Sequence, residues 1–323
     1  DNYPDTVIMA PDSSYFTVIK GDGFYDTGDG DSWYDHYIEN YSLKTTYETK
    51  VQENYSIKMG AESEFQTIQV LDIYKPWLGA SGFGLNYDAY KAQPSSHGVF
   101  IQNHLNLQGM VFDFGLRYDL WFAGKYAEDA LANDSISPLS GALRDKYYNE
   151  TSQVLGRRAR GIISPRFGLA NMISRELSLF ASYSRFTRKP SPQYLYAKLY
   201  TPSNAAYQLF GNPALDFEKV TNIETGLKWL PNPRIALGIS GYIKYIQDYI
   251  AATAISPDPR FPDETYFVYF NLDYATSQGV ELEFIHKASD IFTLSANSSF
   301  SRARGERSLP ADILRGLKTR SEG

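Results

Sequence analysis

Apolar and polar residues alternate along the segment VFDFGLRYDLW, residues 111–121. One side of an extended chain carries Phe112, Phe114, Leu116, Tyr118 and Leu120. The other side carries Asp113, Gly115, Arg117 and Asp119. Because successive side chains of a strand point to opposite faces, the segment is predicted to be a strand with one apolar face and one charged face.

The same two-residue period recurs along the chain. It occupies residues 41–51, 54–65, 98–107, 111–121, 166–173, 177–186, 221–230, 235–246, 265–285 and 292–302. These segments predict about ten strands that pair as five hairpins, since each pair is joined by a short stretch containing Gly, Pro, Asn, Asp or Ser.

Much longer connections separate one hairpin from the next. They cover about residues 71–97, 123–162, 187–218 and 247–264. Long connections without regular structure are uncommon in compact soluble domains. Because they alternate with the tight turns, all of them are expected at one end of the sheet. Short periplasmic turns and long extracellular loops are typical of transmembrane β-barrels.

A soluble barrel would bury the apolar face and expose the polar one, and alternation alone also permits this. Three features favour the inverted arrangement: apolar faces of about ten residues per strand, charged residues in mid-strand, and aromatic residues near strand ends. The aromatic positions are Trp121, Phe122, Tyr183, Phe186, Trp229, Tyr245 and Tyr249. We therefore predict an all-β, antiparallel transmembrane β-barrel. Its lumen-facing residues are expected to include Asp113, Arg117, Asp119, Glu224, Lys228, Glu281 and Glu283.

Composition excludes several kinds of binding site but does not identify the function. The chain has 323 residues, 15% aromatic residues, 26 tyrosines, no cysteine and a formal charge of −6. That charge gives no reason to expect nucleic-acid binding, and the absence of cysteine excludes disulfides and thiolate metal sites. The chain contains no run of 18 apolar residues, so no transmembrane helix is predicted. The first residues lack the pattern of a signal peptide, and no linker divides the chain, so one domain is expected.

The segment KGDGFYDTGDGDSWYD, residues 20–35, is the richest candidate for a metal site. Asp22, Asp26, Asp29 and Asp31 are spaced by glycines and could supply oxygen ligands to a structural Ca²⁺. The order does not match the twelve-residue calcium loop. A solvated acidic loop is the alternative reading, and no other cofactor is expected.

Two further groups of residues lie in the long connections. The aromatic residues Tyr74, Trp77, Tyr87, Tyr90, Tyr194, Tyr196 and Tyr200 suit glycan stacking or peptide capture, and equally suit loops that pack on one another. The basic cluster Arg157, Arg158 and Arg160 suits either lipopolysaccharide phosphates or a solvated loop base. Four scattered histidines and the absence of nucleophile or phosphate-loop motifs predict that the protein is not an enzyme.

Three segments resemble the barrel of TonB-dependent outer-membrane receptors. Residues 163–196 resemble a strand–turn–strand unit that ends in a Tyr-rich segment, and residues 274–285 resemble the family's late GVELE strand. Residues 211–230 resemble its Gly-Asn-Pro signature, with Phe217 where proline is usual. The resemblance spans about residues 36–303. The stretches SPRFG and SRFTRKPSPQYLY are most similar to the Oar-like and SusC-like receptors of Bacteroidetes-type bacteria.

The resemblance implies a receptor in the outer membrane of a Gram-negative bacterium that imports an oligosaccharide, peptide or metal chelate. It implies contact with lipid and lipopolysaccharide, the TonB complex acting through a plug domain, and a surface lipoprotein as a further partner. Such barrels have about 22 strands, so residues 1–323 are expected to form a partial barrel domain without its plug. The alternatives are an Oar-like barrel in adhesion or protein export, a passive porin, or a soluble β-rich binding protein.

Overall fold

The computed structural model describes residues 5–9, 15–19, 32–74, 86–133, 141–199, 209–255, 266–307 and 319–322. Long strands dominate, and no helix among these residues has the length and apolarity needed to cross a bilayer. The elements are β1 (Asp5–Met9), β2 (Tyr15–Ile19), β3 (Ser32–Gln52), β4 (Tyr55–Tyr74), β5 (Asn86–Ala92), β6 (Ser95–Leu107), β7 (Met110–Phe122), α2 (Lys125–Ala132), α3 (Gly141–Glu150), β8 (Ser152–Val154), β9 (Arg157–Met172), β10 (Leu177–Arg188), α4 (Pro192–Tyr196), β11 (Leu209–Phe210), β12 (Glu218–Asn232), β13 (Ile235–Ile255), β14 (Tyr266–Lys287), β15 (Thr293–Arg307) and β16 (Thr319–Glu322).

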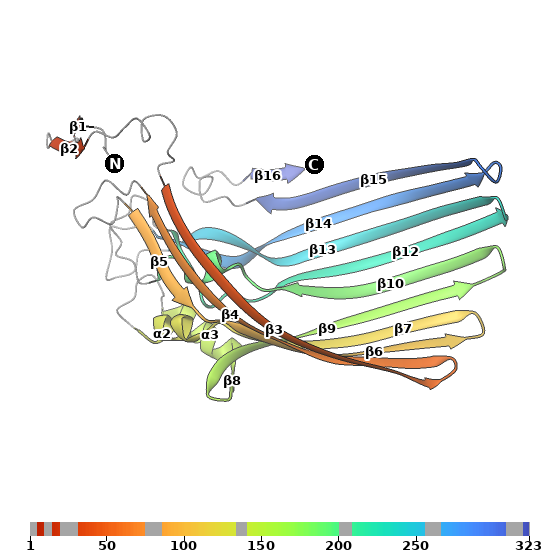
Figure 1. The fold of residues 1–323 in the computed structure, drawn as a ribbon, viewed down its shortest axis with the longest axis horizontal. Helices are drawn as coiled ribbons and strands as arrows, with labels where there is room; N and C mark the ends of the chain where they lie inside the picture. Colours follow the sequence, from red (N-terminus) through yellow and green to blue (C-terminus); the bar gives the residue numbers. More distant parts are fainter. Residues whose placement is uncertain are drawn as a thin grey trace.

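One large curved sheet contains nearly all of these strands. Its order is β16-β15-β14-β13-β12-β10-β9-β7-β6-β4-β3, so strands that follow one another along the chain are neighbours (Figure 1). β5 extends the sheet beside β4, β8 pairs with β9, and β11 pairs parallel to β14. The ten long strands β3, β4, β6, β7, β9, β10, β12, β13, β14 and β15 confirm the predicted antiparallel class and its five hairpins.

The five tight turns lie together at one end of the sheet, which we call the turn end; the opposite end is the loop end (Figure 1). The turn between β6 and β7 shows why so few residues suffice. Gln108 and Gly109 both have positive φ, at 50° and 92°. Two such residues give a hairpin the twist of its flanking strands, and glycine adopts this conformation without steric cost.

Cross-strand partners form rows across the sheet, and the side chains of adjacent rows point to opposite faces. One row joins Asp113 to Gly168, Ser182 and Glu224 across β7, β9, β10 and β12. The next row, one residue further along, contains Phe114, Phe167, Tyr183 and Ile223. The apolar side chains of the second row are 36–52% exposed. Large contiguous apolar surfaces are rare on soluble proteins, so this face is suited to lipid.

The long connections contain more structure than the pattern predicted. Residues 71–97 include β5, and 123–162 include α2, α3, β8 and the start of β9. Residues 187–218 include α4 and β11, and β13 continues to Ile255. The strands therefore extend past the predicted boundaries at the loop end. Helices and short strands cover them there, so their residues need not alternate strictly, and the sequence pattern did not reveal the extension.

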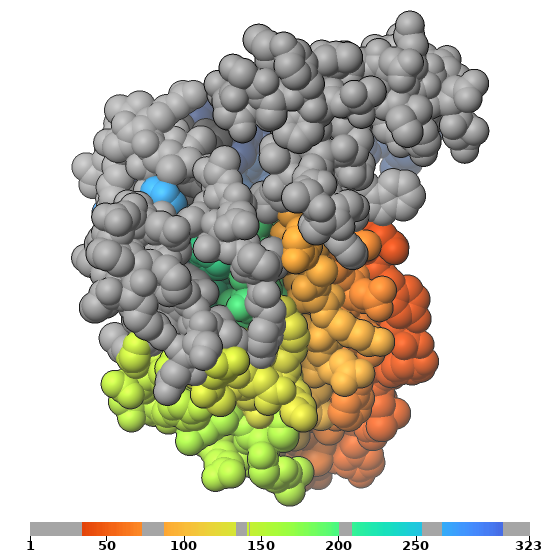
Figure 2. All heavy atoms as spheres, turned by 90° about the vertical axis from the view of Figure 1, so that its left-hand side faces the viewer, coloured from red at the N-terminus to blue at the C-terminus, as the bar shows by residue number. Residues whose placement is uncertain are grey.

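Buried side chains gather at this end in two clusters that together form the loop core. The first contains Tyr90, Trp121, Tyr196 and Phe217, and the second contains Leu131, Leu199 and Val268. Tyr126 packs against both clusters. Viewed from the loop end, the orange atoms of β5 lie beside the yellow and green atoms of the segment between β7 and β9 (Figure 2).

The predicted aromatic positions at strand ends are only partly correct. Trp229, Tyr245 and Tyr249 are exposed, but Trp121 is 3% exposed and packs inside the loop core. An interfacial position for Trp121 is therefore wrong. The physical reason is parity, since residue 121 lies on the same face of β7 as Asp113, and that face meets the loop core. Phe186 likewise shares the face of Ser182 and Ser184 rather than the apolar face.

Candidate functional site

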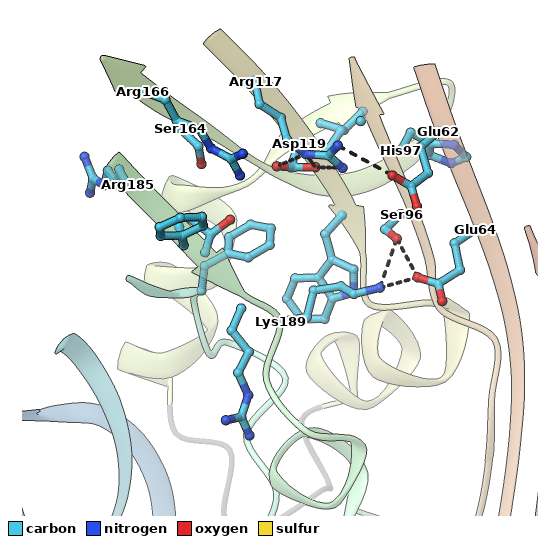
Figure 3. A pocket seen from close by; sticks show the side chains of 17 residues that line it. Glu62, Glu64, Ser96, His97, Arg117, Asp119, Ser164, Arg166, Arg185 and Lys189 are labelled. Atoms are coloured by element: carbon cyan, nitrogen blue, oxygen red, sulfur yellow. Dashed lines mark hydrogen bonds and ion pairs between the residues drawn. The ribbon is translucent and has the colours of Figure 1, made fainter. Parts of the chain in front are cut away.

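Charged and polar side chains from five neighbouring strands form a continuous surface, which we call the polar wall. It consists of Glu62, Glu64, Ser96, Arg117, Asp119, Ser164, Arg166, Arg188 and Lys189. These residues line a pocket of about 390 Å³, to which Trp121 and Phe217 of the loop core also contribute. Figure 3 shows Glu62 and Arg117 directed toward this space from separate strands, and Lys189 from the segment that follows β10.

Most charges of the polar wall are paired within it. The ammonium group of Lys189 donates to Glu64 Oε2 at 2.6 Å and to Ser96 Oγ at 2.9 Å. The Arg117 guanidinium donates to Asp119, with Nη2–Oδ1 at 2.7 Å, and lies 3.5 Å from Glu62 Oε2. Several such pairs in one half-buried surface form a network, which is more rigid than a single exposed pair. The wall therefore has a defined charge pattern.

Arg166 is the exception. Its guanidinium lies 4.7 Å from the centroid of the Phe186 ring, and no carboxylate of the described residues pairs with it. Beside it, the Ser164 side chain is 3% exposed, and its hydroxyl has no hydrogen-bond partner among the described residues. Among the residues of the polar wall, Arg166 is therefore the cation without a carboxylate partner, and Ser164 is the hydroxyl without a hydrogen-bond partner (Figure 3).

The seven residues predicted to face the lumen all lie on one face of the sheet. Arg117 and Asp119 line the pocket of the polar wall, and Asp113 lines the neighbouring pocket, where its Oδ1 is 2.8 Å from His104 Nδ1. A third pocket is lined by Glu224, Lys228, Glu281 and Glu283. The predicted lumen is the space enclosed by a closed barrel, so the assignment of these residues to it stays a prediction.

The Gly-Asn-Pro signature holds the loop core to the sheet. The Asn212 side-chain amide donates to Tyr269 O at 2.7 Å, and its Oδ1 accepts from Ala214 N at 2.8 Å. The Asn212 backbone N–H donates to Tyr194 O at 2.7 Å. All of these groups are buried or half-buried, so every bond replaces one that water would otherwise make. Phe217 packs its ring against Trp121, with centroids 5.8 Å apart.

The three arginines of the basic cluster all bind groups of the protein itself. Arg160 is 4% exposed and donates to Glu150 Oε2 at 2.9 Å and to Ala214 O at 2.7 Å. Arg157 pairs with Glu128 at 3.1 Å, and Arg158 donates to the carbonyls of Tyr148 and Thr151. Neither predicted role, lipopolysaccharide binding or a solvated base, describes Arg160. Its guanidinium is a buried structural link between β9 and the signature segment.

Asp88 joins β5 to the segment after α4. Its Oδ1 accepts a hydrogen bond from the backbone N–H of Lys198 at 2.8 Å. Burial raises the pKa of Asp88 from 3.8 to about 6, and the Asp72 carboxylate adds to the rise, while the Lys198 backbone N–H and ammonium group oppose it. Burial lowers the pKa of Lys198. The connection therefore contains a carboxyl group that titrates near neutral pH.

This titration predicts a pH-dependent loop core. The folded state binds the Asp88 proton more tightly than the unfolded chain does, so stability is gained as pH falls through about 6 and is lost as pH rises. Amide protection factors around Asp88 and Lys198, which are corrected for the intrinsic exchange rate at each pH, are expected to be larger at pH 5 than at pH 7.5. Asp88→Asn keeps the acceptor oxygen and removes the buried charge, so it should stabilise the loop core by about 1–2 kcal/mol at pH 7.5 and abolish the difference. Equal protection factors at both pH values in the unsubstituted protein would contradict this.

The aromatic residues that were predicted to contact a ligand differ in their burial. Tyr90 and Tyr196 are 7% and 0% exposed, so both rings are committed to packing rather than to a ligand. Burial raises the pKa of both phenols, and Tyr196 donates its hydroxyl to Ala123 O at 2.7 Å. Tyr194 packs on Tyr269 with centroids 4.7 Å apart, and Tyr87 is half-buried.

Other predicted positions cannot be placed. Trp77 and Tyr200, the side chain of Tyr74, and the predicted calcium ligands Asp22, Asp26, Asp29 and Asp31 lie outside the described residues. Within the described ranges, no group of three or more His, Cys, Asp or Glu side chains is arranged to hold a metal ion. The calcium site stays a prediction.

Sequence reasoning missed Ser164, Arg166 and Lys189. Ser164 and Arg166 share the face of Gly168 on β9, so alternation could have assigned both to the polar face. Lys189 follows the last residue of β10, and its partner Glu64 is 125 residues away in the chain. Only the strand order brings these two together.

A family of known proteins matches nearly the whole chain. The profile of the family described as TonB dependent receptor-like, beta-barrel, matches residues 5–318. No curated protein matches the sequence. The long loops, short turns and two-faced strands described above agree with that match.

Solved outer-membrane proteins have a similar fold. The FrpB iron transporter from Neisseria meningitidis (F3-3 variant) is 17% identical, with a TM-score of 0.55 over 84% of this chain and 36% of that chain. The outer membrane transporter YddB from Escherichia coli is 14% identical, with a TM-score of 0.56 over 88% and 36%. The ferripyoverdine receptor of Pseudomonas aeruginosa, bound to ferripyoverdine, is 13% identical, with a TM-score of 0.54 over 85% and 34%. This chain thus spans about a third of the length of these proteins, and at such identities the likeness shows the fold alone.

Proposed function

The chain belongs to the family of TonB-dependent receptor-like β-barrels, and we propose that it forms part of the wall and mouth of a transporter that imports a scarce ligand. As a barrel of this family, the sheet spans the outer membrane of a Gram-negative bacterium. The turn end then faces the periplasm and the loop end faces the medium. Energy would come from the TonB complex acting on a plug domain, and no covalent chemistry is required.

The observation that carries the proposal is the polar wall directly beneath the loop core. Arg117, Lys189 and their carboxylate partners lie on the face opposite the exposed apolar row, at the height where Trp121 and Phe217 begin the packed loop region. A polar interior below a structured mouth is the arrangement needed to hold a ligand outside and then pass it inward. A passive porin needs the polar interior but no packed loop core at one end.

Among the ligand classes that the sequence left open, a metal chelate has the best support. FrpB is an iron transporter, and the receptor from P. aeruginosa is bound to ferripyoverdine. Oligosaccharide and peptide capture was suggested by the loop aromatic residues, and two of these, Tyr90 and Tyr196, are buried. We therefore propose a metal chelate as the imported ligand.

Uptake by whole cells tests the proposal. Cells producing the full protein, with and without TonB, are supplied in parallel with a radio-iron siderophore complex, a fluorescent oligosaccharide and a labelled peptide. The iron complex is expected to accumulate only in cells with TonB and an energised inner membrane. Entry that is independent of TonB would indicate a porin. Surface attachment without accumulation would indicate an adhesion barrel, and either result would overturn the proposal.

A further inference from the structure

We propose that Arg166, Ser164 and Phe186 form an oxyanion-binding subsite on the polar wall, which receives a carboxylate or phosphate group of the imported ligand. The inference rests on the proposed transport function and adds a chemical class to it. It is carried by an unpaired guanidinium and an unsatisfied buried hydroxyl at the same pocket.

The charge pattern of the pocket singles out Arg166. Arg117 and Lys189 each have a carboxylate partner within 2.7 Å, and Arg188 lies 3.6 Å from Glu218. Arg166 is exposed, and its only interaction with another side chain in the described ranges is with the Phe186 ring. A guanidinium held on an aromatic face keeps its N–H groups free to bind an oxyanion with two parallel hydrogen bonds.

Arg185 does not compete for this role. It is among the residues that line the pocket, and its Nε also has no hydrogen-bond partner among the described residues. Its cross-strand partner, however, is Thr221, in the row beyond Ser184 and Asn222. Its side chain therefore lies on the opposite face of the sheet from Arg166. Figure 3 shows its guanidinium directed away from the pocket.

Ser164 is the second, independent observation. It faces Arg117 across the strand pair and precedes Arg166 by two residues, so both side chains lie on one face of β9. Its side chain is 3% exposed, and the hydroxyl has no partner among the described residues. Buried hydroxyls normally have hydrogen-bond partners, since leaving one unsatisfied costs about 1–3 kcal/mol. A bound oxyanion would accept this hydrogen bond and remove the cost.

The position of the subsite fits a transport route. Arg166 and Phe186 line both the pocket of the polar wall and the next pocket along the same face. The second pocket, of about 580 Å³, continues toward the turn end past His104 and Ser182. A ligand anion held at Arg166 therefore lies between the loop core and the rest of the polar face.

Binding to the purified full protein in detergent tests the subsite, with citrate and inorganic phosphate as probes and trimethyl citrate as the neutral control. Wild-type protein is expected to bind at least one of the two anions and not the neutral ester. Arg166→Gln should weaken that binding at least tenfold, and Arg166→Lys should restore part of it, because the charge returns without the planar fork. Ser164→Ala should weaken it several-fold.

Arg175→Gln is the matched control. It removes a cation from the exposed turn between β9 and β10, outside the polar wall, so binding should change less than twofold. Equal losses in Arg175→Gln and Arg166→Gln would show general charge attraction and overturn the subsite, as would wild-type affinity in Arg166→Gln. Absence of anion binding in the wild-type protein would also overturn it. Binding by citrate alone would identify the anion as a carboxylate, and binding by phosphate alone as a phosphate; either result supports the subsite.

The two proposals can fail separately. If uptake requires TonB but Arg166→Gln binds anions normally, only the subsite is refuted. If anion binding depends on Arg166 but no ligand accumulates in a TonB-dependent manner, the transport proposal is refuted and the binding site stands.

Discussion

Replacing Trp121 with alanine is expected to lower the free energy of unfolding of the loop core by about 3–5 kcal/mol. The indole is 3% exposed and packs edge-to-face on the ring of Phe217, with centroids 5.8 Å apart. Truncation removes its buried apolar area and leaves a cavity between β7 and the segment that leads into β12. Since Phe217 follows the Asn212 anchor, the change should loosen the segment that closes this end of the polar wall.

Hydrogen exchange of the folded protein in detergent measures this effect. Amides near Tyr196 and Phe217 should lose protection, whereas amides in the centre of β7 should keep theirs. Trp229→Ala is the matched control, since Trp229 is 45% exposed and lies at the turn end. It removes the same side chain without touching the loop core. Unchanged protection near Tyr196 in Trp121→Ala would show that the loop core does not depend on this contact.

Leu116→Arg is expected to cost about 2–4 kcal/mol, because a guanidinium near the middle of a lipid-facing strand must be taken out of water. Leu116 lies halfway along β7 and is 40% exposed, with Ile101 and Pro165 as its cross-strand partners. Reversible unfolding in urea with lipid vesicles, followed by the gel mobility of the folded barrel, measures the loss.

Asp113→Asn is the control from the other face of the same strand. Asp113 lies on the polar face beside His104, and the amide keeps a hydrogen-bond acceptor at the same position. We expect a change below about 1 kcal/mol, as for an exposed ion pair. If the two variants were equally stable, the assignment of lipid to the apolar face would be wrong.

Much of the fold could be predicted because strand alternation and turn composition are local properties. Gln108 and Gly109 mark a two-residue turn, and the residues on either side of them alternate in register. The loop end was harder to predict. Lipid no longer requires strict alternation there, so the ends of β4, β9 and β13 and the helices α2, α3 and α4 had no period-two signal.

The candidate site shows the same division. Arg117 and Asp119 were assigned to the polar face from alternation, and they are found together in the polar wall. Arg160 was expected to bind lipopolysaccharide or to be solvated, because residues of a loop are expected at the surface, and Tyr196 was expected either to bind a ligand or to pack among the loops. Both are buried, since segments distant in the chain meet them: Arg160 donates to Ala214, and Tyr196 donates to Ala123.

The sequence by itself determined the strands, their tight turns and the two faces, because each depends on neighbours one or two residues apart. The tertiary structure alone decided which charges are paired. Glu64 pairs with Lys189 across 125 residues, whereas Arg166, two residues after Ser164, has no carboxylate partner among the described residues. Pairing depends on strand order and register, and these bring distant residues within hydrogen-bonding distance without leaving a local pattern.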